Sequence, residues 1–201
     1  MRNGSSLELP FVIFLPMRVF VAVNFPQDVR NAIWDACAPL RDAGLPVRWV
    51  EPAGLHVTLK FLGQSEAVPG ITAVMDAAAG PARPFSLPLG GVGAFPGLER
   101  PSVIWVGCDG VPPLELLQNR LEQGLETLGF EIEGRPFRPH VTIGRARKDA
   151  RPSAFRGLAD LAEKIEWQGE SLVDSVDLME SRLGGGGSKY QLVHASPLTP
   201  G

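Results

Sequence analysis

The chain is predicted to adopt an α+β fold, because segments with strand character alternate with segments of helical periodicity. Strand character is clear at residues 18–24, which are rich in valine and phenylalanine. Helical periodicity is clear at residues 27–41, where apolar side chains recur every three to four positions. Strands followed by helices occur twice along the chain, which favours antiparallel sheets.

The remaining elements follow from the same signals. Extended segments are expected at residues 47–50, 55–62, 85–92, 102–108, 140–145, 172–182 and 190–195, and helices at residues 68–79 and 153–165. Pro112 and Pro113 suit the first turn of another helix, whose leucine stripe ends before Gly129. The GGGGS run at residues 184–188 resembles an engineered linker, but it lies between two strands, so we favour a natural hairpin loop.

The amino-terminal segment is apolar but does not have the pattern of a membrane span. Its longest uninterrupted apolar run, residues 11–15, is far shorter than the roughly 20 residues that a spanning helix needs. It also lacks the basic region and small-residue cleavage site of a signal peptide. We therefore expect residues 1–16 to be an extension without function, and residues 17–201 to form a single domain.

Composition limits the class of protein. A hydrophobic content of 44% with 20% charged residues is typical of a folded globular chain of 201 residues. The net charge of −3 argues against a surface that binds nucleic acid all over, although it allows a local basic cleft. Two cysteines, Cys37 and Cys108, form neither a disulfide framework nor a zinc motif, so we expect a cytoplasmic protein.

Two of the three histidines begin the same tripeptide, His56-Val57-Thr58 and His140-Val141-Thr142. Because the chain contains only five threonines, chance repetition has odds on the order of 1 in 500. The copies lie in different halves of the sequence, which suggests two lobes that each contribute one copy.

Alternation along a strand gives the tripeptides a chemical meaning. In each copy the histidine and threonine point to one face, and the valine points to the other. If the two strands face each other, two imidazoles and two hydroxyls converge. One imidazole can accept a proton from water while the other donates a proton to a leaving oxygen, and threonine can donate to an oxyanion. This combination suits metal-free hydrolysis of a phosphodiester.

Positive charge for an anionic substrate is concentrated at residues 135–151. The basic side chains there are Arg135, Arg138, Arg145, Arg147, Lys148 and Arg151, opposed only by Asp149. Lys60 shares the parity of His56 and Thr58, so it is expected on the same face. Trp105 and Phe137 could stack on a base or pack in the core.

The sequence gives less support to a metal-binding role for the histidines of the two motifs. Neither copy has a nearby HxH, HxxxH or histidine-carboxylate pattern, so we expect no metal site and no cofactor. His194 has no threonine two places later, and we expect it to be structural.

The sequence resembles the two-histidine (2H) phosphoesterases through WVEPAGLHVTLKFLG and RPFRPHVTIGRAR. It is most similar to the bacterial and archaeal RNA 2′,3′-cyclic phosphodiesterases, also called 2′-5′ RNA ligases. The resemblance includes the opening MRVFVAVNFP, the stretch GAFPGLERPSVIWVG and the ending ESRLGGGGSKYQLV, and it runs from residue 17 to about residue 198.

The resemblance implies a fold of two pseudo-twofold lobes, each with a small antiparallel sheet and outer helices, around an active-site cleft. It implies hydrolysis of RNA 2′,3′-cyclic phosphate ends to 2′-phosphate ends, without a metal. His56 would be the proton donor and His140 the proton acceptor, while Thr58 and Thr142 would hold the nonbridging oxygens. Arg145 occupies a frequent phosphate-binding position of the family, although strict alternation would place it on the face opposite His140.

Three functions follow from these residues. The first is hydrolysis of cyclic phosphates on RNA ends or small cyclic nucleotides, by a protein expected to be a monomer without membrane contact. The second is 2′-5′ RNA ligation in the same site. Because the chain has no GxxxxGK[ST] loop, such ligation would be independent of ATP. The third is a non-catalytic RNA- or nucleotide-binding module, which two intact histidine motifs argue against.

Overall fold

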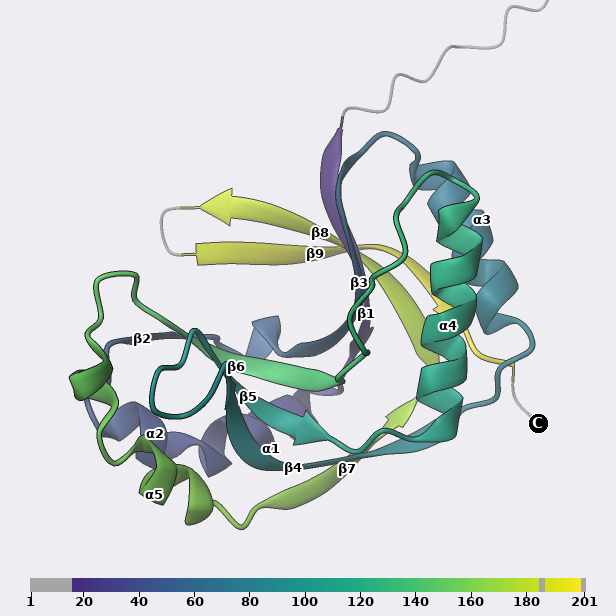
Figure 1. Cartoon of the computed structure of the whole chain (residues 1–201). Helices are drawn as coiled ribbons and strands as arrows, with labels where there is room; N and C mark the ends of the chain where they lie inside the picture. Colours follow the sequence, from purple (N-terminus) through teal and green to yellow (C-terminus); the bar gives the residue numbers. More distant parts are fainter. Residues whose placement is uncertain (1–15, 185–186, 200–201) are drawn as a thin grey trace, which may run out of the picture.

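The computed structural model describes residues 16–184 and 187–199, and it confirms the α+β class (Figure 1). The strands are β1 (Met17–Asn24), β2 (Val47–Trp49), β3 (His56–Ser65), β4 (Phe85–Phe95), β5 (Val103–Cys108), β6 (His140–Ala146), β7 (Gln168–Val173), β8 (Ser175–Gly184) and β9 (Gly187–Pro197). The helices are α1 (Gln27–Ala36), α2 (Ala38–Asp42), α3 (Val68–Ala79), α4 (Pro112–Glu126) and α5 (Leu158–Glu163), with 3₁₀ turns η1 (Pro52–Gly54) and η2 (Pro152–Phe155). The expected extension at residues 1–16 lies outside the described residues except for Pro16.

The sheet consists of two halves, β7-β4-β5-β6 and β3-β1-β8-β9. Its order is β7-β4-β5-β6-β3-β1-β8-β9, with β2 added to β6, and every pairing is antiparallel. The halves meet where Val57 of β3 lies opposite Val141 of β6. The two expected small sheets are therefore the two halves of one sheet, joined through this pair.

Helices cover each half of the sheet on one face (Figure 1). Helices α3 and α4 pack against each other, α3 against β8 and β9, and α4 against β3. In the other half α5 packs against β4, and α1 reaches β7. Helix α4 follows β5 in the chain but packs on the β3 half, and α1 follows β1 but packs on the β7 half. This exchange ties the two lobes together.

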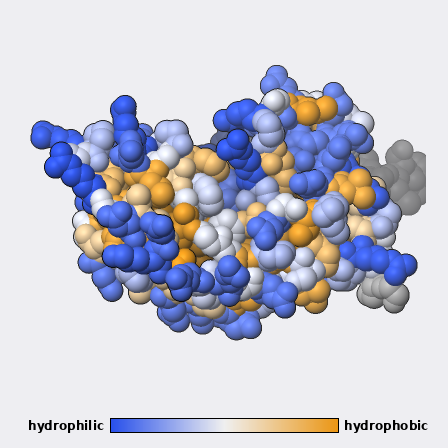
Figure 2. Space-filling view, turned by 60° about the horizontal axis from the view of Figure 1, so that its bottom comes forward, coloured by the Kyte–Doolittle hydropathy of each residue, from blue (hydrophilic) through white to orange (hydrophobic). Residues whose placement is uncertain are grey.

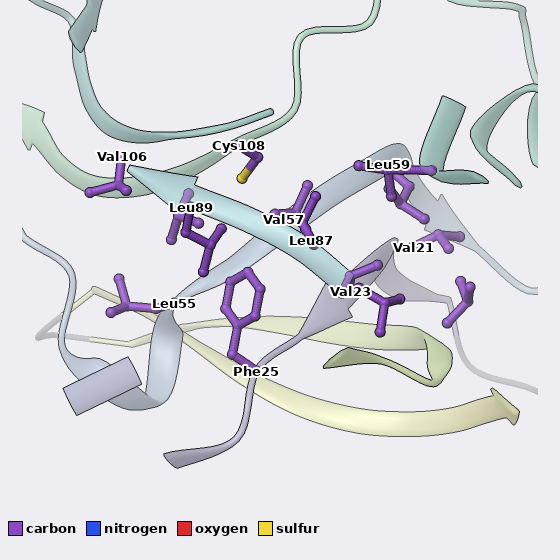
Figure 3. Close-up of a cluster of buried hydrophobic side chains, with 14 of the residues drawn as sticks. Val21, Val23, Phe25, Leu55, Val57, Leu59, Leu87, Leu89, Val106 and Cys108 are labelled. Carbon is purple, nitrogen blue, oxygen red and sulfur yellow. The ribbon is translucent and has the colours of Figure 1, made fainter. Parts of the chain in front are cut away.

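One apolar core runs through both halves. Figure 3 shows buried side chains from β1, β3, β4 and β5 in one cluster; they include Val21, Val23, Val57, Leu59, Leu87, Leu89 and Val106. A second, small cluster of Phe20, Ala22 and Met179 lies apart from it. Burial of the large cluster supplies the main hydrophobic stabilisation of the domain.

Three expected elements are divided in the structure. The expected helix at residues 27–41 breaks at Cys37, because Pro39 in the first turn of α2 has no N–H to continue α1. The expected helix at residues 153–165 becomes η2 and α5, separated by Gly157 with φ +83°. The expected strand at residues 172–182 is the end of β7 and most of β8.

The GGGGS run connects β8 to β9, as predicted for a hairpin. Gly184 pairs with Gly187 at the end of the ladder, and residues 185 and 186 lie outside the described residues. No helix within the described ranges is both long and apolar enough to span a membrane. On the face shown in Figure 2, apolar side chains occur in small groups among hydrophilic ones.

A bulge in β3 changes the direction of Lys60. Thr58 lies opposite Ala22 and Lys60 lies opposite Val21, so Leu59 is an extra residue between them. The sequence prediction assumed regular alternation along the strand, which would place the Lys60 side chain on the same face as His56 and Thr58. The bulge ends this alternation. Lys60 borders the cleft described below, but it is only 7% exposed, and its ammonium turns to a carboxylate of α4 instead of joining the histidine.

The Lys60 ion pair anchors the segment between α4 and β6. The Nζ atom lies 2.5 Å from Glu122 Oε2 and 2.7 Å from the carbonyl oxygen of Glu131. Glu122 also accepts hydrogen bonds from the Gln118 amide at 3.0 Å and from the Glu133 N–H at 3.3 Å. The carboxylate thus connects β3, α4 and the chain that leads to the second histidine.

Replacing Glu122 by alanine is expected to lower the free energy of unfolding by about 3–5 kcal/mol, because Lys60 would keep a buried charge without a partner. The control is Glu126→Ala, which removes an exposed carboxylate from the same helix and is expected to change stability by less than about 0.5 kcal/mol. Urea unfolding followed by circular dichroism measures both. Equal effects of the two substitutions would show that the ion pair is not a structural anchor.

Candidate active site

The two His-Val-Thr tripeptides begin β3 and β6 and meet at the junction of the sheet halves. Val57 and Val141 face each other in an antiparallel pair, and both side chains are fully buried. The histidines and threonines on either side of these valines therefore share the opposite face. All four line a cleft of about 1670 Å³. The predicted convergence of the two motifs is thus present in the fold.

Both histidines are held by the same backbone contact. His56 Nδ1 lies 2.8 Å from the carbonyl oxygen of Gly54, and His140 Nδ1 lies 2.7 Å from that of Arg138. A carbonyl only accepts, so each Nδ1 carries a hydrogen and donates it. This leaves Nε2, on the far side of each ring, as the nitrogen that can accept or release a proton in the cleft.

Aromatic rings fix the two imidazoles from the side. The His56 ring lies 4.9 Å from Phe20 and 5.0 Å from Tyr190, which it meets edge to face. The His140 ring meets Phe95 edge to face at 5.0 Å. These aromatic residues were not predicted from the sequence, because no motif marks them and their neighbours come from distant strands.

The buried position of His56 lowers the pKa of its imidazole. Desolvation lowers the pKa of His56 to about 4, and the charges of Arg30 and Arg145 act in the same direction. The hydrogen bond to Gly54 opposes this shift but does not cancel it. His56 is consequently neutral in the free protein at pH 7.

A second bulge brings Arg145 to the cleft. Ile143 is the extra residue between Thr142 and Gly144 in the pairing of β6 with β5. The bulge reverses the alternation, so Arg145, opposite Val103, lines the cleft together with the histidines. This resolves the conflict between strict alternation and the expected position of Arg145.

Only part of the basic stretch borders the cleft. Arg135, Arg138 and Arg145 line it, whereas Arg147, Lys148 and Arg151 do not belong to its wall. Arg135 is paired with Glu133 at 2.9 Å. Arg48 of β2 lies directly opposite Arg145, and both are exposed. Two guanidinium groups at neighbouring positions repel each other in the absence of an anion, which is consistent with phosphate binding at this end.

Trp105, Phe137 and His194, which the sequence analysis also named, lie in different parts of the structure. Trp105 packs beside Phe95, 5.4 Å away, and is not part of the cleft wall, whereas Phe137 is. His194 lies on β9 with Nε2 2.8 Å from Asp76 Oδ1 of α3, which is consistent with a structural role. Among the described residues, no three histidine, cysteine, aspartate or glutamate side chains are grouped so that they could hold a metal ion.

The arrangement is suited to acid–base chemistry on a bound anion. Two Nε2 atoms can each exchange one proton, two threonine hydroxyls can donate hydrogen bonds, and Arg145 supplies positive charge. A group that is attacked on one side and leaves on the other fits between two such histidines.

Comparison with known proteins agrees with this geometry. Residues 26–184 match the sequence model of the 2′-5′ RNA ligase superfamily. The RNA 2′,3′-cyclic phosphodiesterase of Aeropyrum pernix is 35% identical over 152 residues, which are 73% of this chain and 82% of the relative. The RNA 2′,3′-cyclic phosphodiesterase of Methanothermobacter thermautotrophicus is 29% identical over 179 residues, 88% of this chain and 96% of the relative.

Solved structures share the fold over nearly the whole chain. A crystal structure of a Thermus thermophilus protein superposes with a TM-score of 0.75 at 29% identity, covering 92% of this chain and 99% of that one. Escherichia coli LigT complexed with 3′-AMP gives 0.69 at 26% identity, with the same coverage. The chain belongs to the 2′-5′ RNA ligase superfamily, the two-histidine phosphoesterase family that its motifs indicated.

Proposed function

We propose that this protein is an enzyme that hydrolyses the 2′,3′-cyclic phosphate at RNA 3′ ends and leaves a 2′-phosphate. The observation that carries the proposal is the pair of histidines in the cleft, each with Nδ1–H bound to a carbonyl and Nε2 available. The named activity of the two archaeal relatives supports the substrate class.

In the proposed reaction His140 Nε2 accepts a proton from the attacking water, and the water oxygen bonds to phosphorus. The bond from phosphorus to the 3′ oxygen breaks, and His56 Nε2 donates its proton to that oxygen. Thr58 and Thr142 donate hydrogen bonds to the nonbridging oxygens, and Arg145 balances their charge. Lys60 has no part in this scheme, since Glu122 holds its ammonium.

The donor role requires His56 to gain a proton with the substrate. Its pKa of about 4 makes it neutral in the free cleft at pH 7. A bound phosphate brings negative charge next to the ring, which raises the pKa by stabilising the imidazolium. The low intrinsic affinity for the proton also makes the protonated ring a strong acid toward the leaving oxygen.

Replacement of either His56 or His140 by alanine is expected to lower turnover about 10²- to 10⁴-fold, the usual contribution of general acid–base catalysis. Single-turnover cleavage of a short RNA with a cyclic phosphate end measures this. The control is His194→Ala, which removes the remaining histidine outside the cleft and should keep activity close to wild type. Activity within a few-fold of wild type in both cleft variants would contradict the proposal.

The rate is expected to have a bell-shaped dependence on pH, since one histidine must be neutral while the other is protonated. The profile of kcat/KM reports the free enzyme, so one limb should lie near the His56 pKa of about 4. In the profile of kcat this limb should move to higher pH, because bound phosphate favours the protonated ring. Measurement from pH 3 to 9 tests both statements; a flat rate from pH 5 to 9 would oppose the two-histidine mechanism.

Product analysis in EDTA separates the proposed reaction from its alternatives. We expect a 2′-phosphate end from a cyclic phosphate RNA, without added metal. A 3′-phosphate would mean that the other oxygen leaves. The superfamily also carries the name of 2′-5′ RNA ligases, so an RNA with a free 5′-hydroxyl is included, and joined product would indicate ligation. Binding without reaction would indicate a non-catalytic module.

We further propose that the enzyme is a cytoplasmic monomer. The two cysteines, Cys37 and Cys108, are buried free thiols, and burial raises their pKa values to about 11 and about 12. Such thiols are unreactive and need no oxidising compartment.

A further inference from the structure

Arg30 of α1 contacts the elements that hold His56, although Arg30 itself is not part of the cleft wall. Its Nη2 atom lies 3.5 Å from Asn24 Oδ1, and Asn24 is the strand partner of His56. Its Nη1 atom lies 3.4 Å from the carbonyl oxygen of Ala53 in η1. The next residue, Gly54, supplies the carbonyl that binds the imidazole. The guanidinium is thus tethered both to the strand beside the histidine and to the turn before it.

A buried carboxylate completes the network around Arg30. Asp177 of β8 is only 6% exposed, and its Oδ2 accepts a hydrogen bond of 2.7 Å from Asn24 Nδ2. Ser175 Oγ donates to the other carboxylate oxygen at 3.0 Å. Burial lowers the pKa of Arg30 and the charge of Asp177 opposes this effect, so the guanidinium stays charged at neutral pH. The network therefore holds a permanent positive charge beside the first motif.

Packing alone does not explain an arginine at this position. The Nε atom of Arg30 is buried and has no hydrogen-bond partner among the described residues, and an unsatisfied buried donor destabilises a fold. The second motif is built differently, because the strand partner of His140 is Gly107, which has no side chain. Asn24, which connects Arg30 to the strand of His56, thus has no counterpart beside His140.

We propose that Arg30 is a positioning residue of the candidate active site, which acts through His56 by holding a positive charge next to its imidazole. The inference rests on the proposed function, in which His56 donates its proton to the leaving oxygen. Desolvation is the main cause of the low pKa of His56, and among the charges that lower it Arg30 has the largest effect. A positive neighbour disfavours the imidazolium, so the ring releases its proton more readily. Arg30 therefore makes His56 a stronger acid toward the leaving oxygen.

Titration of the ligand-free, ¹⁵N-labelled protein from pH 3 to 8 tests this role through the imidazole signals of His56. In Arg30→Gln the midpoint should move to higher pH by about one unit, because the like charge is gone. In Arg30→Lys the midpoint should stay near the wild-type value of about 4, since an ammonium keeps the charge. The matched control is Arg83→Gln, which removes an exposed arginine outside the cleft wall and should leave the midpoint unchanged.

The lysine variant separates the charge of Arg30 from a general change of the structure. The other titratable groups around the ring are Arg145 and His140 of β6 and Tyr190 of β9, and no variant alters them. An unmoved midpoint in Arg30→Gln would overturn the proposal, and so would equal shifts in the glutamine and lysine variants. Arg30→Met provides the same comparison if the glutamine variant does not fold.

The titration uses no substrate, so its result is independent of the proposed reaction. If the wild type opens no cyclic phosphate but the midpoint shifts in Arg30→Gln, the proposed reaction fails and the effect of Arg30 on His56 stands. If the wild type forms 2′-phosphate ends but the midpoint does not move, the reaction stands and the role of Arg30 is overturned. In an active enzyme the limb of the kcat/KM profile near pH 4 should also move to higher pH in Arg30→Gln and stay in place in Arg30→Lys.

Discussion

The pairing of Val57 with Val141 is the constraint on which the rest of the site depends. It joins the two halves of the sheet at one antiparallel position, and it buries both valines in the common core. Because neighbours along a strand alternate between faces, burying the valines forces both histidines and both threonines to the other face. The helices that cross between the halves hold this junction together. The proposed active site is thus the polar side of a core contact.

The proposed roles of proton donor and proton acceptor require the surroundings of His56 and His140 to differ, although the two motifs have the same sequence and the same backbone contact. Both imidazoles use Nδ1 for a backbone carbonyl, but burial and the nearby positive charges of Arg30 and Arg145 depress the pKa of His56. Bulges in β3 and β6 bring different side chains to the cleft, Phe61 in one half and Arg145 in the other. The two halves of the candidate site therefore differ in charge as well as in the environment of the histidine.

Sequence patterns predicted what depends on short spacing and missed what depends on distant pairing. The position of Thr58 beside His56 needed only two residues of regular strand, and it was predicted correctly. The ammonium of Lys60 was expected beside them but turns to α4, because a bulge becomes visible only when the partner strand is known. The aromatic rings around His56 were also unpredictable, since Tyr190 reaches it from the last strand.

The most direct test of the account is the tautomeric state of the three histidines, measured by ¹⁵N NMR of the ligand-free protein at pH 8. We expect His56 and His140 in the Nδ1–H form, because both donate to carbonyl oxygens. His194, whose Nε2 lies 2.8 Å from the Asp76 carboxylate, should have the Nε2–H form and serves as an internal reference. An Nε2–H signal from His56 or His140 would contradict the proposed orientation of the acid–base pair.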